Sequence, residues 1–104
     1  MSSIKLHYLY RDGGNNKRYN SVVFSNPENL SIPLVQAVLK KHMLEGEWFY
    51  AVRWKLVDMH FPRWDRELDH DLHEIHQLQE SDEQPTDSRT LQEFLNSLPT
   101  PRWE

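Results

Sequence analysis

The chain has no cysteine, only three glycines and no long apolar run. Without cysteine there are no disulfides, thiolate metal ligands or thiol nucleophiles. No stretch approaches the roughly 20 apolar residues that span a bilayer, and Met1 is not followed by the basic and apolar regions of a signal peptide. These absences predict a cytoplasmic protein that does not enter a membrane.

The composition predicts one small domain. A length of 104 residues fits a single domain with one modest core. Only 38% of the residues are hydrophobic, but 12 aromatic residues compensate in part because each buries a large area. Pro99 and Pro101 end the last apolar pattern. We therefore expect a single domain over residues 1–98 and a frayed tail over residues 99–104.

Charge is distributed unevenly along the chain. Residues 1–57 carry eight basic and four acidic side chains, a net charge of +4, whereas residues 58–104 carry four arginines and twelve acids, a net charge of −8. Such asymmetry affects the choice of partner and the rate of association rather than the fold. The acidic half suits a basic partner, although two differently charged solvated faces would give the same pattern.

Alternating apolar residues predict three strands. Residues 4–11 and 19–25 flank a turn rich in glycine and asparagine, which is typical of a β-hairpin. Residues 48–57 alternate again, with large aromatic side chains on one face. We expect these aromatics to belong to the core rather than to a ligand-binding platform.

Two amphipathic segments predict helices over residues 32–44 and 90–98. Ser31 is a suitable N-cap with Pro33 in the first turn, and Thr90 and Glu93 have the spacing of a capping box. The predicted fold is α+β: a small antiparallel sheet, made of the hairpin and at least one further strand, with two or three helices packed on one face. The predicted core comprises Ile4, Leu6, Val23, Leu34, Val38, Leu39, Val52, Trp54, Phe94 and Leu95.

The pattern between Asp58 and Glu83 is ambiguous. Leu68, Leu72 and Ile75 follow helical spacing, and the alternation expected of a strand gives two poorly defined faces. We expect a helix here and keep the strand as the alternative. Residues 81–88 are polar and contain Pro85, so we expect a loop.

This segment also holds the densest group of metal-ligand residue types. On a helix, Asp69, His73, His76 and Glu80 share one strip, whereas a strand would group His70, Glu74 and His76. Imidazole and carboxylate are natural ligands for divalent transition metals. The candidate metal ligands are Asp69, His70, His73 and His76, and the competing interpretation is a solvated face without a cofactor.

Other chemistry has less support. No nucleophile elbow, phosphate-binding loop or desolvated carboxylate pair is visible, so we do not expect an enzyme. Tyr8, Tyr10 and Tyr19 alternate with basic residues on the hairpin, a mixture used for nucleic-acid binding. The overall charge of −4 argues against direct nucleic-acid binding.

The leading hypothesis is therefore a small protein-interaction module that binds a basic partner protein through its acidic C-terminal half. Aromatic anchors within a charged rim are typical of strong interfaces. An immunity-type or anti-defence inhibitor is one form of such a module, and a metal-binding or metal-dependent protein is the alternative. The candidate partner-binding residues are Trp64, Asp65, Glu67, Asp69, Asp71, Glu74 and Glu80.

Overall fold

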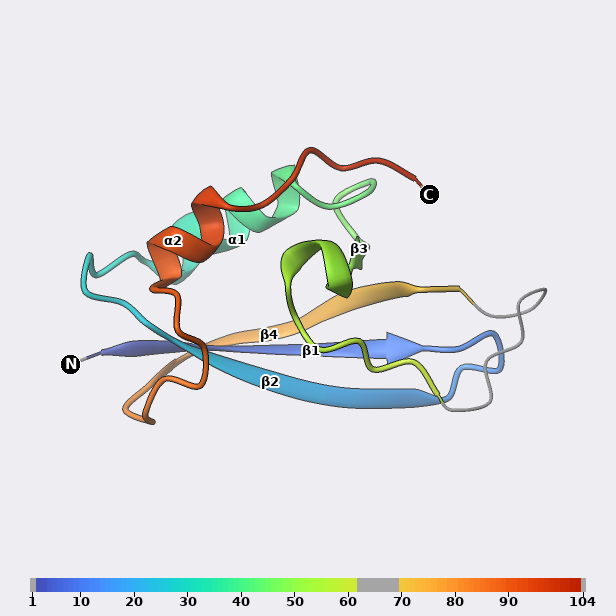
Figure 1. Cartoon of the computed structure of the whole chain (residues 1–104), viewed down its shortest axis with the longest axis horizontal. Coiled ribbons are helices and arrows are strands. Elements are labelled where there is room, and N and C mark those ends of the chain that lie inside the picture. Colours follow the sequence, from blue (N-terminus) through green and yellow to red (C-terminus); the bar gives the residue numbers. More distant parts are fainter. Residues whose placement is uncertain (1, 62–69, 104) are drawn as a thin grey trace.

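A computed structural model describes residues 2–61 and 70–103 of the chain. Four strands form one antiparallel sheet in the order β2-β1-β4-β3, and two α-helices and a 3₁₀ turn accompany it (Figure 1). The α+β class and the small antiparallel sheet are confirmed. The elements are β1 Ser3–Arg11, β2 Lys17–Ser25, α1 Ile32–Lys41, β3 Phe49–Tyr50, the 3₁₀ turn η1 Ala51–Trp54, β4 Leu72–Ser81 and α2 Leu91–Asn96.

The β1–β2 hairpin follows the sequence prediction closely. Its turn is organised by Asp12, whose Oδ1 accepts hydrogen bonds from the backbone N–H groups of Gly14 (2.9 Å) and Asn16 (2.8 Å). Asn15 takes a left-handed conformation (φ 65°), which asparagine tolerates better than most residues. The resulting register pairs Ile4 with Phe24, so that both apolar side chains face the core.

The predicted helix over the histidine-rich segment is wrong, because residues 72–81 form strand β4 along β1. The pairing shifts register between His7 and Tyr8, which places one extra residue on β4. His73, Ile75 and Leu78 therefore all pair with residues of β1 that face the core, despite their irregular spacing. This bulge is why neither strand face looked apolar in the sequence.

The predicted third strand over residues 48–57 is much shorter in the structure. Of this segment, only the two residues of β3 pair with β4. The chain then turns through η1 and reaches a left-handed conformation at Lys55 (φ 55°). The turn brings Trp54 inward, where its ring stacks on Phe49 with centroids 4.1 Å apart. Val52, expected in the core, is 68% exposed as a result.

Both predicted helices are present, with shorter C-terminal ends. The Ser31 side chain accepts a hydrogen bond from Leu34 N–H at the start of α1, and Thr90 and Glu93 form the predicted capping box at α2. Leu34, predicted to be buried, is half-exposed on α1. No helix in the described part of the chain is long and apolar enough to cross a bilayer.

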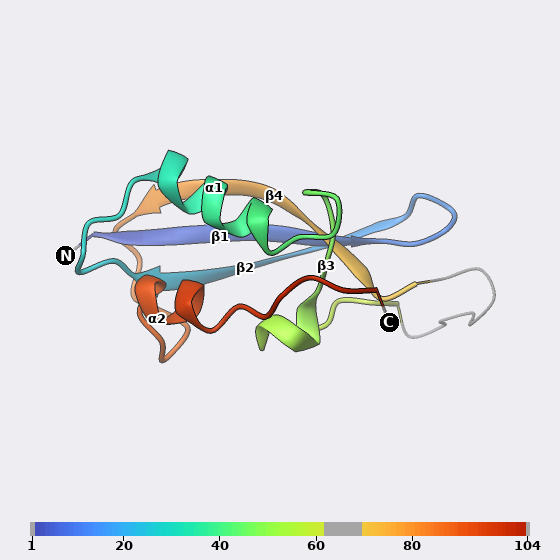
Figure 2. The same ribbon diagram turned by 90° about the horizontal axis from the view of Figure 1, so that it is seen from above.

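The core lies between the sheet and the helical elements. In Figure 1, α1, α2 and η1 lie above the strands, and Figure 2 shows α1 along the β1–β4 side and α2 on the β2 side. Phe24, Val35, Leu39, Trp54 and Phe94 are among the side chains that pack together there. The segment after α2 lies along this layer, and the carbonyl of Pro99 is 3.0 Å from His42 Nδ1.

Candidate functional site

The outer edge of β4 is open for most of its length. β3 pairs only with Leu72 and His73. In the turn before Phe49, Leu44 and Trp48 pair with each other. Within residues 2–61 and 70–103, the rest of this edge, residues 74–81, has no strand neighbour. A strand placed here would lie in line with β3 and would complete the sheet.

A groove of about 540 Å³ lies between this free edge and α1. One end is bordered by the turn at residues 44–48, where the backbone N–H of Leu44 donates to the carbonyl of Trp48. Gly46 is in the left-handed region (φ 70°), and a Cβ there would come within 3.0 Å of Lys40 Cε. The apolar side chains that line the groove are Leu39, Met43, Trp48, Ile75 and Leu78.

The direction of the backbone groups along β4 follows from the hairpin. Val23 N–H donates to Thr86 Oγ1, and its carbonyl accepts from Thr86 N–H, so Val23 points its backbone away from β1. In an antiparallel ladder, residues alternate between pairs that exchange hydrogen bonds and pairs that do not. Lys5, opposite Val23, therefore points its backbone toward Gln79 of β4. The next residue, Glu80, points its backbone N–H and C=O to the free edge.

Acidic side chains outnumber basic ones around the groove. Glu47 and Glu74 border it and Glu80 follows along β4, whereas Lys40 is the one basic side chain among its lining residues. Glu74 also forms an ion pair with Arg11, with Nε and Oε2 2.8 Å apart. The groove is therefore apolar at its floor, and its rim carries two acidic residues against one basic residue.

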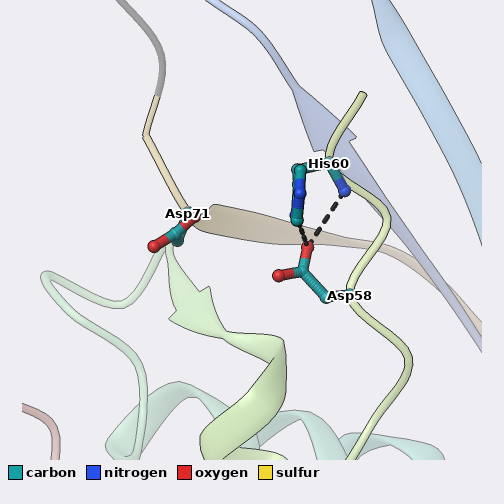
Figure 3. A group of neighbouring side chains, drawn as sticks. All are labelled: Asp58, His60 and Asp71. Carbon is teal, nitrogen blue, oxygen red and sulfur yellow. Dashed lines mark hydrogen bonds and ion pairs between the residues drawn. The ribbon is translucent and has the colours of Figure 1, made fainter. Parts of the chain in front are cut away.

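A second candidate site lies at the start of β4. Asp58, His60 and Asp71 each offer one ligand atom, and these three atoms lie within 4.8 Å of one another. Figure 3 shows Asp71 at the beginning of β4, opposite the Asp58–His60 pair. His60 Nδ1 and the backbone N–H of His60 both bind Asp58 Oδ1, at 2.9 and 3.0 Å. Although partial burial opposes the effect, these bonds hold the pKa of Asp58 below its usual range.

His73 supports this cluster from the core side. Its ring is fully buried, and Nε2 lies 3.0 Å from the backbone nitrogen of Met59. Because an amide N–H only donates, Nε2 must accept, and in the neutral ring Nδ1 carries the proton that it donates to the Asp71 carbonyl. Burial lowers the pKa of His73 below its ordinary value, so the neutral form is favoured.

The structure separates the residues of the predicted metal site. His73 contacts the rings of Tyr8 and Tyr10 on the core side of the sheet. His76 is exposed and lies against Tyr19, with ring centroids 5.3 Å apart, on the opposite side. His70 Nδ1 accepts a hydrogen bond from the Leu72 backbone, and Asp69 lies outside the described residues.

Three of the seven predicted partner-binding residues fall where the structure is described. Glu74 lies at the rim of the groove, Glu80 lies further along β4, and Asp71 belongs to the cluster with Asp58 and His60. The remaining members lie outside the described residues: Trp64, Asp65, Glu67 and Asp69. Tyr8 and Tyr10, considered for nucleic-acid stacking, are buried, whereas Tyr19 is 54% exposed.

Sequence reasoning did not find the groove or the Asp58–His60–Asp71 cluster. The spacing of Asp58 and His60, with one residue between them, was the available signal for the cluster, because it sets both side chains on one side of an extended segment. The groove had no such signal, since it depends on where β3 ends.

Comparison with known proteins gives no relative for this chain: no protein-family model, curated protein or solved structure matches it. Function is therefore inferred from the geometry and chemistry of the two sites.

Proposed function

We propose that this chain is a protein-interaction module that binds an extended segment of a basic partner protein as an added strand at the free edge of β4. The observation that carries the proposal is the open edge of β4 beside an apolar groove. Strand addition to a sheet edge is a recurring mode of peptide recognition, in which backbone hydrogen bonds give affinity and side-chain pockets give specificity.

The dimensions of the groove fit a short peptide. The free edge covers residues 74–81, and at about 3.4 Å per residue it is about 27 Å long. Every second side chain of an added strand would point toward α1, because side chains alternate between the two faces. Leu39, Met43 and Ile75 would then receive apolar side chains of the partner.

The acidic rim favours a basic partner and disfavours a second copy of this chain. Pairing of two β4 edges would bring Glu74 and Glu80 of both copies to one interface. Like charges crowded at a strand pair destabilise it, whereas lysine or arginine on the added strand would be stabilised. The preferred ligand therefore alternates apolar and basic residues.

The partner is of the class expected from the sequence, a basic protein, and an added strand at β4 is its binding mode. A module that binds a basic protein segment without catalysing a reaction is suited to inhibition of a nucleic-acid-handling protein. An immunity-type or anti-defence inhibitor, which we propose by analogy, is one such role.

The test is selection of peptides from a random displayed library against the full chain, followed by titration of the enriched peptides. We expect alternating apolar and basic residues in the selected peptides. Glu80→Pro should abolish their binding, because it removes a backbone N–H from the free edge while leaving the bonds between Gln79 and Lys5 in place.

Glu80→Gln is the matched control, because it removes the same charge and retains the backbone N–H. It should weaken binding mainly at low salt, where exposed charges are least screened. Peptides that bind Glu80→Pro as tightly as the unmodified chain would contradict the proposal, as would a library that yields no specific peptide. Thermal unfolding of both variants would show that they remain folded.

A further inference from the structure

We infer that Asp58, His60 and Asp71 form a three-ligand site for one divalent transition-metal ion, with the remaining coordination positions open to water. This site is separate from the proposed strand-binding groove, and either could exist without the other. Its residues come from the segment after η1 and from the start of β4, which the pairing of β3 with Leu72 and His73 brings together.

The distances fit a metal ion after a small closure. Two ligands on opposite sides of an ion at about 2.1 Å lie about 4.2 Å apart, and neighbouring ligands lie about 3 Å apart. His60 Nδ1 and Asp58 Oδ1 are already 2.9 Å apart, as neighbouring ligands would be. All separations in the cluster are within 4.8 Å, so they exceed the first figure by at most about 0.6 Å, which a small rotation of the Asp71 side chain would supply.

A small cavity borders both carboxylates. Asp58 and Asp71 line it together with Tyr50, Ala51 and Val52, and its volume is about 40 Å³. That volume is sufficient for a water molecule, whose share of liquid volume is about 30 Å³. A metal ion held between the carboxylates would thus have space for a water ligand. It would also relieve the repulsion between two negative charges placed this close.

The ligand types select the class of ion. Two carboxylates and one imidazole suit Zn²⁺, Mn²⁺ or Fe²⁺, whereas Cu⁺ prefers thiolate and thioether ligands; the chain has no cysteine, and Met59 packs against the core. Three protein ligands with open positions are typical of sites that retain an exchangeable water.

The surrounding hydrogen bonds fix the ligand segment before an ion arrives. His73 Nε2 accepts from the Met59 backbone N–H, and Arg18 donates to the His60 carbonyl at 3.3 Å. Both contacts hold residues 58–60 against the sheet. His73 is a positioning residue in this arrangement, because it acts on the ligands through the backbone of Met59 and through Asp71.

The experiment is a calorimetric titration of the chelator-treated full chain with ZnCl₂ and, separately, with MnCl₂. We expect one ion per chain. His60→Gln and Asp71→Asn should each weaken binding by at least the roughly 10- to 100-fold that is lost when outer-shell partners of a metal are removed. The matched control is His76→Gln, which removes an exposed histidine from the other side of the sheet and should leave the affinity unchanged.

Paramagnetic Mn²⁺ locates the ion independently of the variants. It should broaden the NMR signals of the Met59 and Leu72 amides most strongly, while leaving those of Ser3 and Ser25, at the far end of the sheet, sharp. No binding of either metal, equal binding by His60→Gln and Asp71→Asn, or broadening centred on His76 would each overturn the assignment.

Discussion

Phe94 gives the most direct test of how the helical elements are attached to the sheet. Its ring is 1% exposed and stacks on Phe24 of β2, with centroids 4.4 Å apart and planes 19° apart. It also meets Trp54 edge-on at 6.0 Å, and the Arg89 guanidinium lies 5.1 Å from its centroid. One side chain therefore joins α2, η1 and β2.

Phe94→Ala should cost about 3–5 kcal/mol of unfolding free energy, because it removes a fully buried ring and leaves a cavity. The stacked contact with Phe24 favours the upper part of that range, since aromatic pairs contribute about 0.5–1.5 kcal/mol beyond burial. A domain of this size has about 5–15 kcal/mol in total. At about 4–8 °C per kcal/mol, the melting temperature should fall by at least 12 °C or so.

The assay is urea-induced unfolding followed by fluorescence of the chain's tryptophans, with Val52→Ala as the control. Val52 is 68% exposed, and its truncation should change the free energy by less than about 0.5 kcal/mol. A loss below about 1 kcal/mol for Phe94→Ala, with an unchanged urea dependence, would refute the reasoning, because it would show α2 to be peripheral to the core.

Two further predictions concern the pH dependence of stability and the second helix. Because burial lowers the pKa of His73 below 6.5, the unfolded chain binds a proton first as the pH falls. The free energy of unfolding should therefore decrease as the pH drops below about 6.5, and the decrease should be smaller in His73→Gln. If the free energy of unfolding changed equally with pH in both chains between pH 7.5 and 5, this prediction would be contradicted. Thr90→Ala should lower the free energy of unfolding by about 1 kcal/mol in the same assay, because it removes the capping box. Thr90→Ser should retain most of that stability.

Local sequence patterns predicted the parts of the fold that are determined locally. The hairpin, the start of α1 at Ser31 and the start of α2 at Thr90 depend on residues within a few positions of one another. Turn and capping chemistry acts over that range, so one sequence is sufficient to recognise it.

The histidine-rich segment could not be assigned in this way. The strand identity of β4 depends on pairing with β1, more than sixty residues earlier, and on a register shift that changes which residues face the core. Without knowledge of that shift, Leu78 falls outside the alternation that His73 and Ile75 begin. Tertiary pairing therefore decided between two local interpretations that the sequence left open.

The candidate sites depend on the same long-range features. The metal-ligand chemistry of histidine and aspartate near position 70 is visible in the sequence, and Glu74 and Glu80 were expected to contact a partner. The position of Asp58 and His60 beside Asp71 is not visible there, because that contact requires the early end of β3.

Backbone amide exchange at Glu80 tests the proposed binding mode most directly. Its N–H points to the free edge of β4, so an added strand would protect it from exchange with solvent. Tyr19, on the free edge of β2, is the matched control, because the same alternation directs its backbone away from β1. With a saturating selected peptide, we expect much slower exchange at Glu80 and no change at Tyr19. Bound peptide with unchanged exchange at Glu80 would contradict it.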